Sequence, residues 1–309
     1  MRAYYSDCFV IPLPPGHRFP IDKYKHVRAG VVSLGVLRAS ELELAPLIDR
    51  PALELVHTPE YLARLFSGAL SEPEQRRLGF PWSEELLIRS RASVGGTLAA
   101  AQWALARGIG GNLAGGTHHA FADHGEGFCV FNDIAVAIRA LQAEGKIARA
   151  VVVDLDVHQG NGTAEIFEDD PAIFTFSIHG KHNYPFHKTR STRDVALEDE
   201  TGDDEYLSVL RQHLPEVLNL ADADIVFYQA GVDPLGDDAL GRLALTAEGL
   251  RRRDELVFRE AAKRSLPVVL TMGGGYARPI ARTVEAHIGT YRAARDVFGA
   301  SLTDARACR

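Results

Sequence analysis

The sequence predicts an α/β fold of three layers, in which helices cover both faces of a mostly parallel sheet. From about Ala150 onward, short runs rich in β-branched apolar residues alternate with longer stretches of helical periodicity, as repeated βα units do. Within runs such as VVV and VVL, apolar residues occupy successive positions, which is the pattern of strands buried on both faces of a parallel sheet. The composition, 46% hydrophobic and 24% charged, excludes disorder, collagen and coiled coil.

Four segments are expected as strands because they are short, apolar and bounded by turn residues. In chain order they are AVVVDLDV, AIFTFSI, DIVFYQAG and PVVLTMGGG. Helical periodicity marks longer segments at 83–107, 131–144, 203–220, 246–264 and 279–298. The helix at 246–264 opens with Thr246 and Glu248 in an arrangement that resembles a helix cap. The first third of the chain is expected to be mainly helical. Since no repeat or low-complexity linker interrupts the chain, we expect a single domain over residues 1–309.

Charge and cysteine content exclude several classes of function. The chain of 309 residues carries 34 Lys plus Arg against 41 Asp plus Glu, a formal charge of −7, so no nucleic-acid partner is expected. Its three cysteines, Cys8, Cys129 and Cys308, include no close pair, which excludes a disulfide framework. Neither a signal peptide nor an uncharged apolar run of about 18 residues is found, so we expect a cytoplasmic protein without a membrane partner.

Polar residues that suit a metal ion follow two of the expected strands. Asp156 and His158 stand two apart at the end of the first strand, where side chains of an extended segment face the same side. Asp233 directly follows the strand DIVFYQAG, and ligands of open α/β sheets bind beyond such carboxyl ends. Three protein ligands leave positions open for water and substrate, as catalytic metals require. We expect Zn2+, with Fe2+, Co2+ and Mn2+ as alternatives.

Two further motifs indicate acid/base and hydrogen-bonding chemistry. His118 and His119 are adjacent in a glycine-bounded loop, and paired histidines in such a loop suggest proton transfer. Tyr276 follows three glycines at the end of the last expected strand. These glycines allow close backbone packing and position the phenol, but they do not form a phosphate loop, since no Lys-Ser or Lys-Thr follows. Either motif alone fits a structural role equally well.

Six motifs in order resemble those of the zinc-dependent histone deacetylase family. They are H-x-x-x-Y-L at 57–62, GG-x-HHA at 115–120, GFC-x-FND at 127–133, DLDVHQGNGT at 154–163, QAGVDPLGDD at 229–238 and GGGY at 273–276. The resemblance covers about residues 6–291. It implies the arginase/deacetylase fold, a parallel sheet of about eight strands with helices on both faces, and hydrolysis of the amide of an acylated amine.

The resemblance also implies a role for each matching residue. Asp156, His158 and Asp233 would be the zinc ligands. His118 and His119 would flank the attacking water, with His119 taking its proton and later protonating the leaving amine. Tyr276 would donate a hydrogen bond to the oxyanion, and Asp154 would orient His118.

One position departs from the pattern of many deacetylases, which carry a second Asp behind the other histidine. This sequence has Asn161 there. An amide can orient His119 but cannot neutralise an imidazolium, so we expect His119 to lose its proton readily and be available as a base. Asn161, Gln159 and the N-terminal LPPGHRFP resemble the class IV branch of the family, to which we assign the chain.

The substrate-binding residues also come from the resemblance. Phe128, beside Gly127, would be one wall of a narrow tunnel, with Tyr184 or Phe186 as the opposite wall. Leu240 would lie at the rim, and Gly127 and Gly274 would also bind the substrate. Arg18 fits an inner cavity and a surface salt bridge equally well. Structural K+ would be held around Asp154, Asp156, His158 and Ser177, with Phe167 near a second site.

Several functions remain open from the sequence. The leading hypothesis is removal of acetyl or longer fatty acyl groups from lysine side chains of proteins or peptides. Deacetylation of acetylpolyamines or other small acylated amines is the alternative, and the acidic stretch EDETGDDE at 198–205 fits both a cation site and a helix N-terminus. A non-catalytic module that binds acyl ligands is a third, although every metal ligand, both histidines and the tyrosine are present. An arginase-like dimetal site would need more carboxylates. The acyl chain, the metal in the cell, the oligomeric state and any role of histones stay open.

Overall fold

The computed structural model describes residues 1–307, with side chains described up to residue 299. It contains an eight-stranded sheet in the order β2-β1-β3-β8-β7-β4-β5-β6, and every pair of neighbouring strands is parallel. The strands are β1 (Arg2–Tyr5), β2 (Leu42–Leu44), β3 (Ile109–Asn112), β4 (Ala150–Asp154), β5 (Ile173–Gly180), β6 (Arg193–Leu197), β7 (Ile225–Gln229) and β8 (Val268–Thr271). The predicted α/β class and a sheet of about eight parallel strands are confirmed.

The central strands are buried on both faces, which explains their uninterrupted apolar runs. Every residue of β4, β7 and β8 is buried. In β4, Val151 and Val153 belong to one hydrophobic cluster, whereas Ala150 and Val152 belong to another. Alternate side chains of a strand therefore pack into two hydrophobic cores, one on each side of the sheet.

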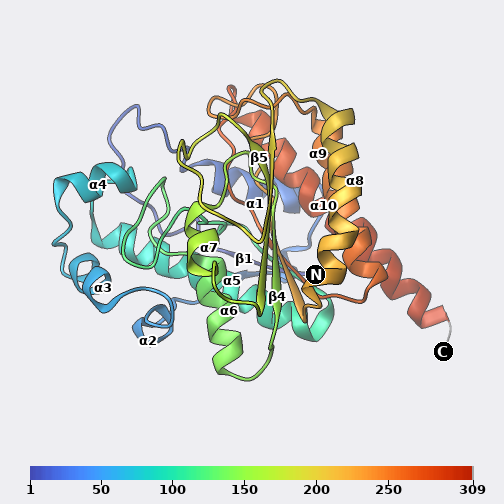
Figure 1. Ribbon diagram of the computed structural model, residues 1–309, viewed down its shortest axis with the longest axis horizontal. Helices are drawn as coiled ribbons and strands as arrows, with labels where there is room; N and C mark the ends of the chain where they lie inside the picture. Colours follow the sequence, from blue (N-terminus) through green and yellow to red (C-terminus); the bar gives the residue numbers. More distant parts are fainter. Residues whose placement is uncertain (308–309) are drawn as a thin grey trace.

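Helices cover the sheet on both faces (Figure 1). The first core is formed with α1, α8, α9 and α10, and the second with α5 and α6. The helices are α1 (Lys23–Ser33), α2 (Arg50–Leu53), α3 (Pro59–Phe66), α4 (Glu72–Leu78), α5 (Glu84–Arg107), α6 (Asp133–Ala143), α7 (Asn161–Ile166), α8 (Asp203–Ala221), α9 (Ala247–Lys263) and α10 (Ala281–Ala307), with a 3-10 turn at Ala39–Glu41. The three-layer arrangement is thus the predicted one.

The predicted helices agree with the structure to within a few residues at their starts. Ser83 accepts a hydrogen bond from the Leu86 N–H at 3.1 Å and begins α5. Thr246 accepts one from the Gly249 N–H at 3.0 Å and begins α9, so the expected cap is present. The C-terminal helix extends to Ala307, beyond the expected residue 298.

Four strands were not expected from the sequence, and three of the four expected ones were too long, whereas β5 continues past the expected segment to Gly180. β1 and β2 span only 4 and 3 residues, and β3 reads IGGN, so none carries a strand-like apolar run. β6 reads RDVAL and lies at the edge of the sheet with half-exposed positions. The ladder of β4 ends at Asp154, because the chain turns there toward the loop that carries Asp156 and His158. The first third is mainly helical, yet it supplies β1 and β2.

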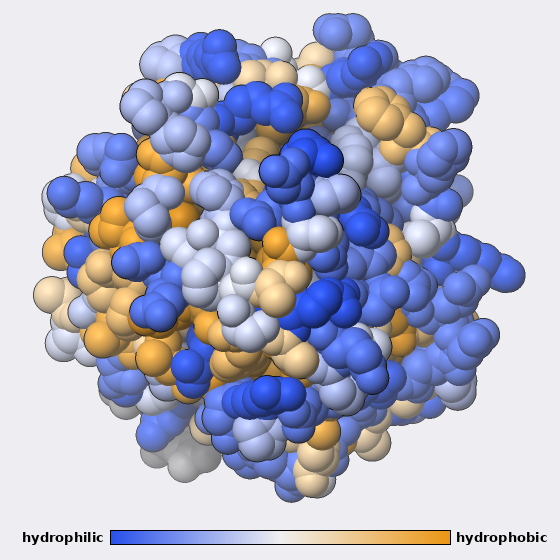
Figure 2. Space-filling view, turned by 90° about the vertical axis from the view of Figure 1, so that its left-hand side faces the viewer, coloured by the Kyte–Doolittle hydropathy of each residue, from blue (hydrophilic) through white to orange (hydrophobic). Residues whose placement is uncertain are grey.

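A third hydrophobic cluster joins α3, α4 and α5 to the loop before α6, at residues such as Leu62, Leu78 and Val94. Figure 2 shows the side of the molecule on which α2, α3 and α4 lie, where apolar residues gather between hydrophilic ones.

Among the described residues, no helix is long and apolar enough to cross a membrane. Cys8 is exposed and Cys129 is buried, both with free thiols, and Cys308 lies outside the described residues.

Candidate metal and catalytic site

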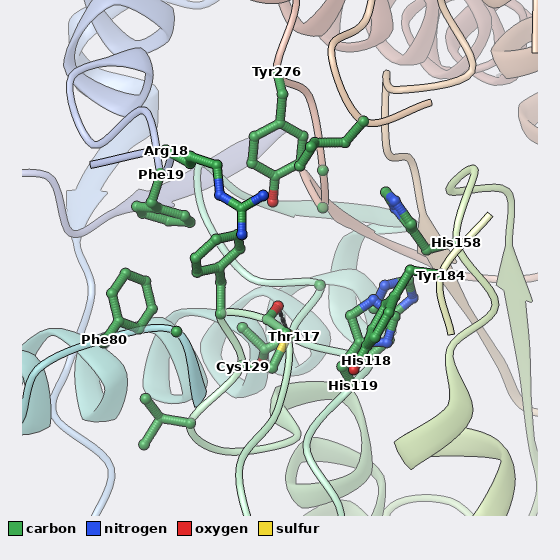
Figure 3. A pocket seen from close by; sticks show the side chains of 18 of the residues that line it. Arg18, Phe19, Phe80, Thr117, His118, His119, Cys129, His158, Tyr184 and Tyr276 are labelled. Carbon is green, nitrogen blue, oxygen red and sulfur yellow. Dashed lines mark hydrogen bonds between the residues drawn. The ribbon is translucent and has the colours of Figure 1, made fainter. Parts of the chain in front are cut away.

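A cavity of about 740 Å³ lies beyond the carboxyl ends of the central strands. Loops that follow β3, β4, β5, β7 and β8 line it, together with the N-terminal segment around His17. β7 lies between β4 and β8, so loops far apart in sequence begin side by side. Figure 3 shows the cavity with Tyr276 on one wall and His118, His119 and His158 across from it.

Asp156, His158 and Asp233 form a buried cluster in this cavity. They offer ligand atoms that all lie within 4.8 Å of one another. His158 Nδ1 is 3.0 Å from Asp156 Oδ1 and 3.2 Å from Asp233 Oδ2. The backbone fixes both carboxylates: the Gly274 N–H donates to Asp156 at 2.8 Å, and the Val157 N–H donates to Asp233 at 2.9 Å. The cluster joins the loops after β4, β7 and β8.

The donor set fits a divalent cation. Asp233 Oδ2 is buried and accepts no hydrogen bond from the residues that the structure describes. Burial and the neighbouring Asp156 raise the pKa of Asp233 to about 7, since two carboxylates close together resist ionisation. A cation bound there would balance both charges. Glycine is required at position 274 beside this cluster, because a Cβ there would lie 1.9 Å from Asp233 Oδ2.

His118 is paired with a buried carboxylate. Its Nδ1 lies 2.7 Å from Oδ2 of Asp154, the last residue of β4. Burial opposes a charge on this imidazole, but Asp154 and Asp156 outweigh it and raise the pKa of His118 to about 9. His118 is therefore suited to carry a positive charge in the cavity.

His119 is paired with an amide instead. Its Nδ1 lies 2.6 Å from Oδ1 of Asn161, at the start of α7. Burial lowers the pKa of His119 well below its usual range, and the nearby His118 and His158 act in the same direction. With Nδ1–H donating to the amide oxygen, Nε2 keeps a free lone pair. The two adjacent imidazoles, whose centroids are 4.2 Å apart, thus differ in charge preference.

Tyr276 lies at the end of the glycine loop that follows β8. Its backbone N–H donates to Asp238 at 2.6 Å. The ammonium of Lys23, on α1, donates to the carbonyl oxygens of Gly273 and Gly275 at 3.2 and 3.4 Å and lies 5.2 Å from the centroid of the Tyr276 ring. Burial raises the pKa of Tyr276 well above its usual value, so the phenol keeps its proton and can donate it in a hydrogen bond.

The expected tunnel residues line the same cavity, at different depths. The ring centroid of Tyr184 lies 5.1 Å from that of His119, whereas Phe186 is 78% exposed and its ring centroid lies 6.2 Å from that of Tyr184. Of the two candidates for the opposite wall, Tyr184 is thus the inner residue. Phe128 has a φ of 66° and packs on Phe80.

Small and apolar residues complete the cavity wall. A Cβ at Gly127 would lie 2.8 Å from His119 Cδ2, so glycine leaves room for the imidazole. Leu240 and Gly274 also line the cavity.

The three other residues expected in the site, which are Arg18, Ser177 and Phe167, lie in different environments. Arg18 lines the cavity beside Tyr276 (Figure 3), and no ion pair involves it within the described part of the chain. Ser177 is the register partner of Asp154 in the sheet, and its hydroxyl lies 2.9 Å from His179. Phe167 is buried at the end of α7 under the guanidinium of Arg139.

Two residues of the site were not predicted from the sequence. Lys23 holds the tyrosine loop, and Glu126 accepts a hydrogen bond from the Asn161 amide at 3.0 Å. Glu126 had a local signal, because it stands between two glycines directly before the GFC motif. Lys23 had none, since its partners follow it by about 250 residues.

Comparisons with known proteins agree with this geometry. Residues 17–291 match the family model described as the histone deacetylase domain. An uncharacterized protein of Picosynechococcus sp. is 45% identical over 296 residues, covering 96% of this chain and 98% of that protein. Histone deacetylase 2 of Arabidopsis thaliana is 34% identical over 277 residues, 87% of this chain and 72% of the relative. The acetoin utilization protein AcuC of Bacillus subtilis is 32% identical over 222 residues, 65% and 57% of the two chains.

Solved structures share the fold. An HDAC homologue from Aquifex aeolicus superimposes with a TM-score of 0.80 at 21% identity, over 96% of this chain and 88% of the other. An HDAC homologue complexed with SAHA gives 0.79 at 23% identity, with the same coverage of 96% and 88%.

Proposed function

The chain belongs to the histone deacetylase family, and from this premise we propose that it is a zinc-dependent hydrolase that removes acyl groups from lysine side chains of proteins or peptides. The observation that carries the proposal is the buried Asp156, His158 and Asp233 cluster beside two imidazoles and a phenol. A hydrolase of amides needs these parts together: a cation site, a base and an oxyanion donor. The assignment to class IV stays a prediction.

Zinc held by Asp156, His158 and Asp233 would polarise the acyl carbonyl and lower the pKa of the attacking water. His119 Nε2, whose lone pair is free while Nδ1–H donates to Asn161, accepts the proton of that water and returns it to the leaving amine.

The other groups stabilise charge as it develops. His118 holds a positive charge balanced by Asp154, close to the reacting atoms. The Tyr276 hydroxyl donates to the carbonyl oxygen as that oxygen becomes negative. The potassium ions that the resemblance implies around Asp154, Asp156, His158, Ser177 and Phe167 stay a prediction.

The charge around the cavity favours an acyl-lysine peptide over a cationic acetylpolyamine. Four exposed arginines line the cavity, namely Arg18, Arg76, Arg77 and Arg242. Arg76 and Arg242 form ion pairs with acidic residues, whereas Arg18 and Arg77 form none with any residue that the structure describes. The carboxylates among the described lining residues are those of Asp156 and Asp233, which the metal would neutralise. A free ammonium group would meet repulsion at this mouth.

The acidic stretch at 198–205 is engaged elsewhere. Glu198 pairs with Lys181 at 2.6 Å, and Asp199 pairs with Arg242 at 3.2 Å. Asp203 begins α8 and accepts a hydrogen bond from the Thr246 N–H at 2.9 Å. These contacts support the helix-terminus interpretation of the stretch rather than a site for a polyamine.

Turnover by the zinc-loaded protein tests the proposal. Matched peptides carry acetyl-, octanoyl- or myristoyl-lysine, each flanked by either acidic or basic residues, with N-acetylputrescine alongside and Tyr276→Phe as control. We expect hydrolysis of a lysine peptide that the control lacks, with acidic flanks preferred and the preference reduced by salt. Activity on N-acetylputrescine alone would move the function to small-molecule metabolism. Absence of turnover on every substrate would favour a module that only binds acyl ligands.

A further inference from the structure

A half-buried carboxylate lies behind the amide that orients His119. Glu126 Oε1 accepts a hydrogen bond from Asn161 Nδ2 at 3.0 Å. The same oxygen accepts a hydrogen bond from the Tyr184 hydroxyl, and the His124 Nε2 lies 3.8 Å from Oε2. The Glu126 side chain is 16% exposed. His119, Asn161 and Glu126 therefore form one chain of hydrogen bonds that leads away from the cavity.

An asparagine by itself does not determine which nitrogen of a histidine carries the proton. If its oxygen faces the ring, Nδ1 must carry the proton, and if its NH2 group faces the ring, Nδ1 must be the acceptor. The first arrangement leaves Nε2 free as a base, and the second protonates Nε2. A carboxylate in the place of Asn161 would not present this ambiguity, because it can only accept.

Glu126 removes the ambiguity because an ionised carboxylate offers no donor. Only the NH2 end of Asn161 can face it, so the amide oxygen must face His119 Nδ1, as observed at 2.6 Å. Burial would raise the pKa of Glu126, but the nearby His124 imidazole and the hydrogen bonds from Tyr184 and Asn161 outweigh it and lower that pKa to about 2. Glu126 thus stays an acceptor at any working pH.

We propose that Glu126 is a positioning residue of the deacylase reaction: it fixes the orientation of the Asn161 amide and thereby the Nδ1–H tautomer that makes His119 a base. The inference rests on the proposed function for its catalytic meaning, but the tautomer is a property of the chain itself. By binding the Tyr184 hydroxyl as well, Glu126 joins the tunnel wall to the same network.

Exchange of the amide and the carboxylate tests the proposal. In Glu126→Gln, the new amide can accept from or donate to Asn161, so both orientations become possible. In Asn161→Asp, two carboxylates face each other. In the double variant, the NH2 group introduced at position 126 can donate to the carboxylate introduced at position 161, whose second oxygen still accepts Nδ1–H from His119.

We expect each single variant to lower kcat on the order of tenfold and the double variant to recover most of this loss, with KM little changed throughout. Glu165→Gln, an exposed acid on the same helix as Asn161, is the control for loss of a nearby charge and should leave kcat unchanged. Additive losses in the double variant would overturn the proposal, since they indicate two independent structural roles.

A second readout does not depend on turnover. Nitrogen-15 spectra of histidine-labelled, metal-free protein report which nitrogen of His119 carries the proton. We expect a single Nδ1–H tautomer in the unaltered protein and in Glu165→Gln, and an admixture of Nε2–H in Glu126→Gln. An unchanged tautomer in Glu126→Gln would refute the positioning role. If no acyl substrate is hydrolysed while the tautomer shifts, the proposed function fails and the role of Glu126 in orienting the imidazole stands.

Discussion

The two neighbouring imidazoles of the cavity owe their different properties to single atoms behind them. Asp154 accepts from His118 and favours its charged form, whereas Asn161 accepts from His119 without a charge to balance an imidazolium. One buried pair, with ring centroids 4.2 Å apart, thus combines an imidazole that favours the charged form with one that favours the neutral form. Proton transfer needs this division, since a base that is already protonated cannot act.

Replacement of Tyr276 by Phe removes the donor without disturbing the metal cluster. We expect kcat to fall roughly 10²–10³-fold, as for loss of one oxyanion donor. Metal content should stay unchanged, because the cluster is built from Asp156, His158 and Asp233. Steady-state kinetics on the best acyl-lysine peptide and elemental analysis check this together. An unaltered kcat/KM would remove Tyr276 from the mechanism.

Replacement of Asp233 by Ala should abolish metal binding. Asp233 supplies one of three protein ligands, and two ligands hold a divalent ion weakly. Elemental analysis after dialysis against zinc is the measurement. Asp237→Ala is the matched control, because Asp237 follows in the same loop but pairs with Arg282 at 2.9 Å. A full metal content in Asp233→Ala would exclude this residue from the ligand set.

At the scale of elements, the loop after β8 is held by a helix from the other end of the chain. The ammonium of Lys23, at the start of α1, is fully buried and bonds two carbonyl groups of the glycine loop. Three glycines in a row would otherwise leave Tyr276 on a pliable segment. The sequence places these two elements about 250 residues apart, so only the fold brings them together.

Replacement of Lys23 by Met, which is similar in length, should loosen that loop. We expect the free energy of local opening at residues 273–276 to fall by roughly 1.5–3 kcal/mol, the usual value for hydrogen bonds to a charged group, and kcat to fall with it. Hydrogen exchange of the loop amides is the measurement. Lys25→Met, exposed on the same helix, is the control. Equal exchange in the two variants would contradict the anchoring role.

The expected elements also show which patterns are readable locally. The buried central strands and the cap of α9 at Thr246 were correctly predicted, because an apolar run or a threonine before a helix acts within a few residues. β3 was missed, since IGGN owes its strand conformation to pairing with β1 and β8. β6 was missed because an edge strand needs little apolar surface.

At the scale of the whole molecule, buried neutral histidines make stability depend on pH. His57 is 1% exposed, and its Nε2 accepts the Asn132 N–H at 3.1 Å, which requires an unprotonated nitrogen. Burial lowers the pKa of His57 to about 4. Burial likewise lowers the pKa of His179 to about 4.

The unfolded chain therefore binds these protons first as the pH falls. The contribution of these two histidines to stability does not change above about pH 6.5 and decreases from there to about pH 4, by roughly 3 kcal/mol for His57 alone. Urea unfolding at pH 7.5 and pH 5 checks this prediction. His57→Gln keeps an acceptor but does not titrate, so its loss over this range should be smaller than that of the exposed control His26→Gln. Parallel losses in the two variants would show that His57 does not contribute.

The sequence by itself determined the α/β class, the motifs and the family resemblance. The triad Asp156, His158 and Asp233 was readable because two members stand two apart and the third follows a strand in the same way. These features are local, and a parallel sheet necessarily gathers the carboxyl ends of its strands.

Only the tertiary structure decided what surrounds those residues. Three features join segments that are far apart in the chain: the hydrogen bond between Glu126 and Asn161, the hydrogen bonds of Lys23 to the glycine loop, and the four exposed arginines that line the cavity. No periodicity encodes such pairings, because each depends on how loops of different length pack once the sheet order is fixed. The order β3-β8-β7-β4 brings the loops together, and the packing of single side chains then determines which atoms meet.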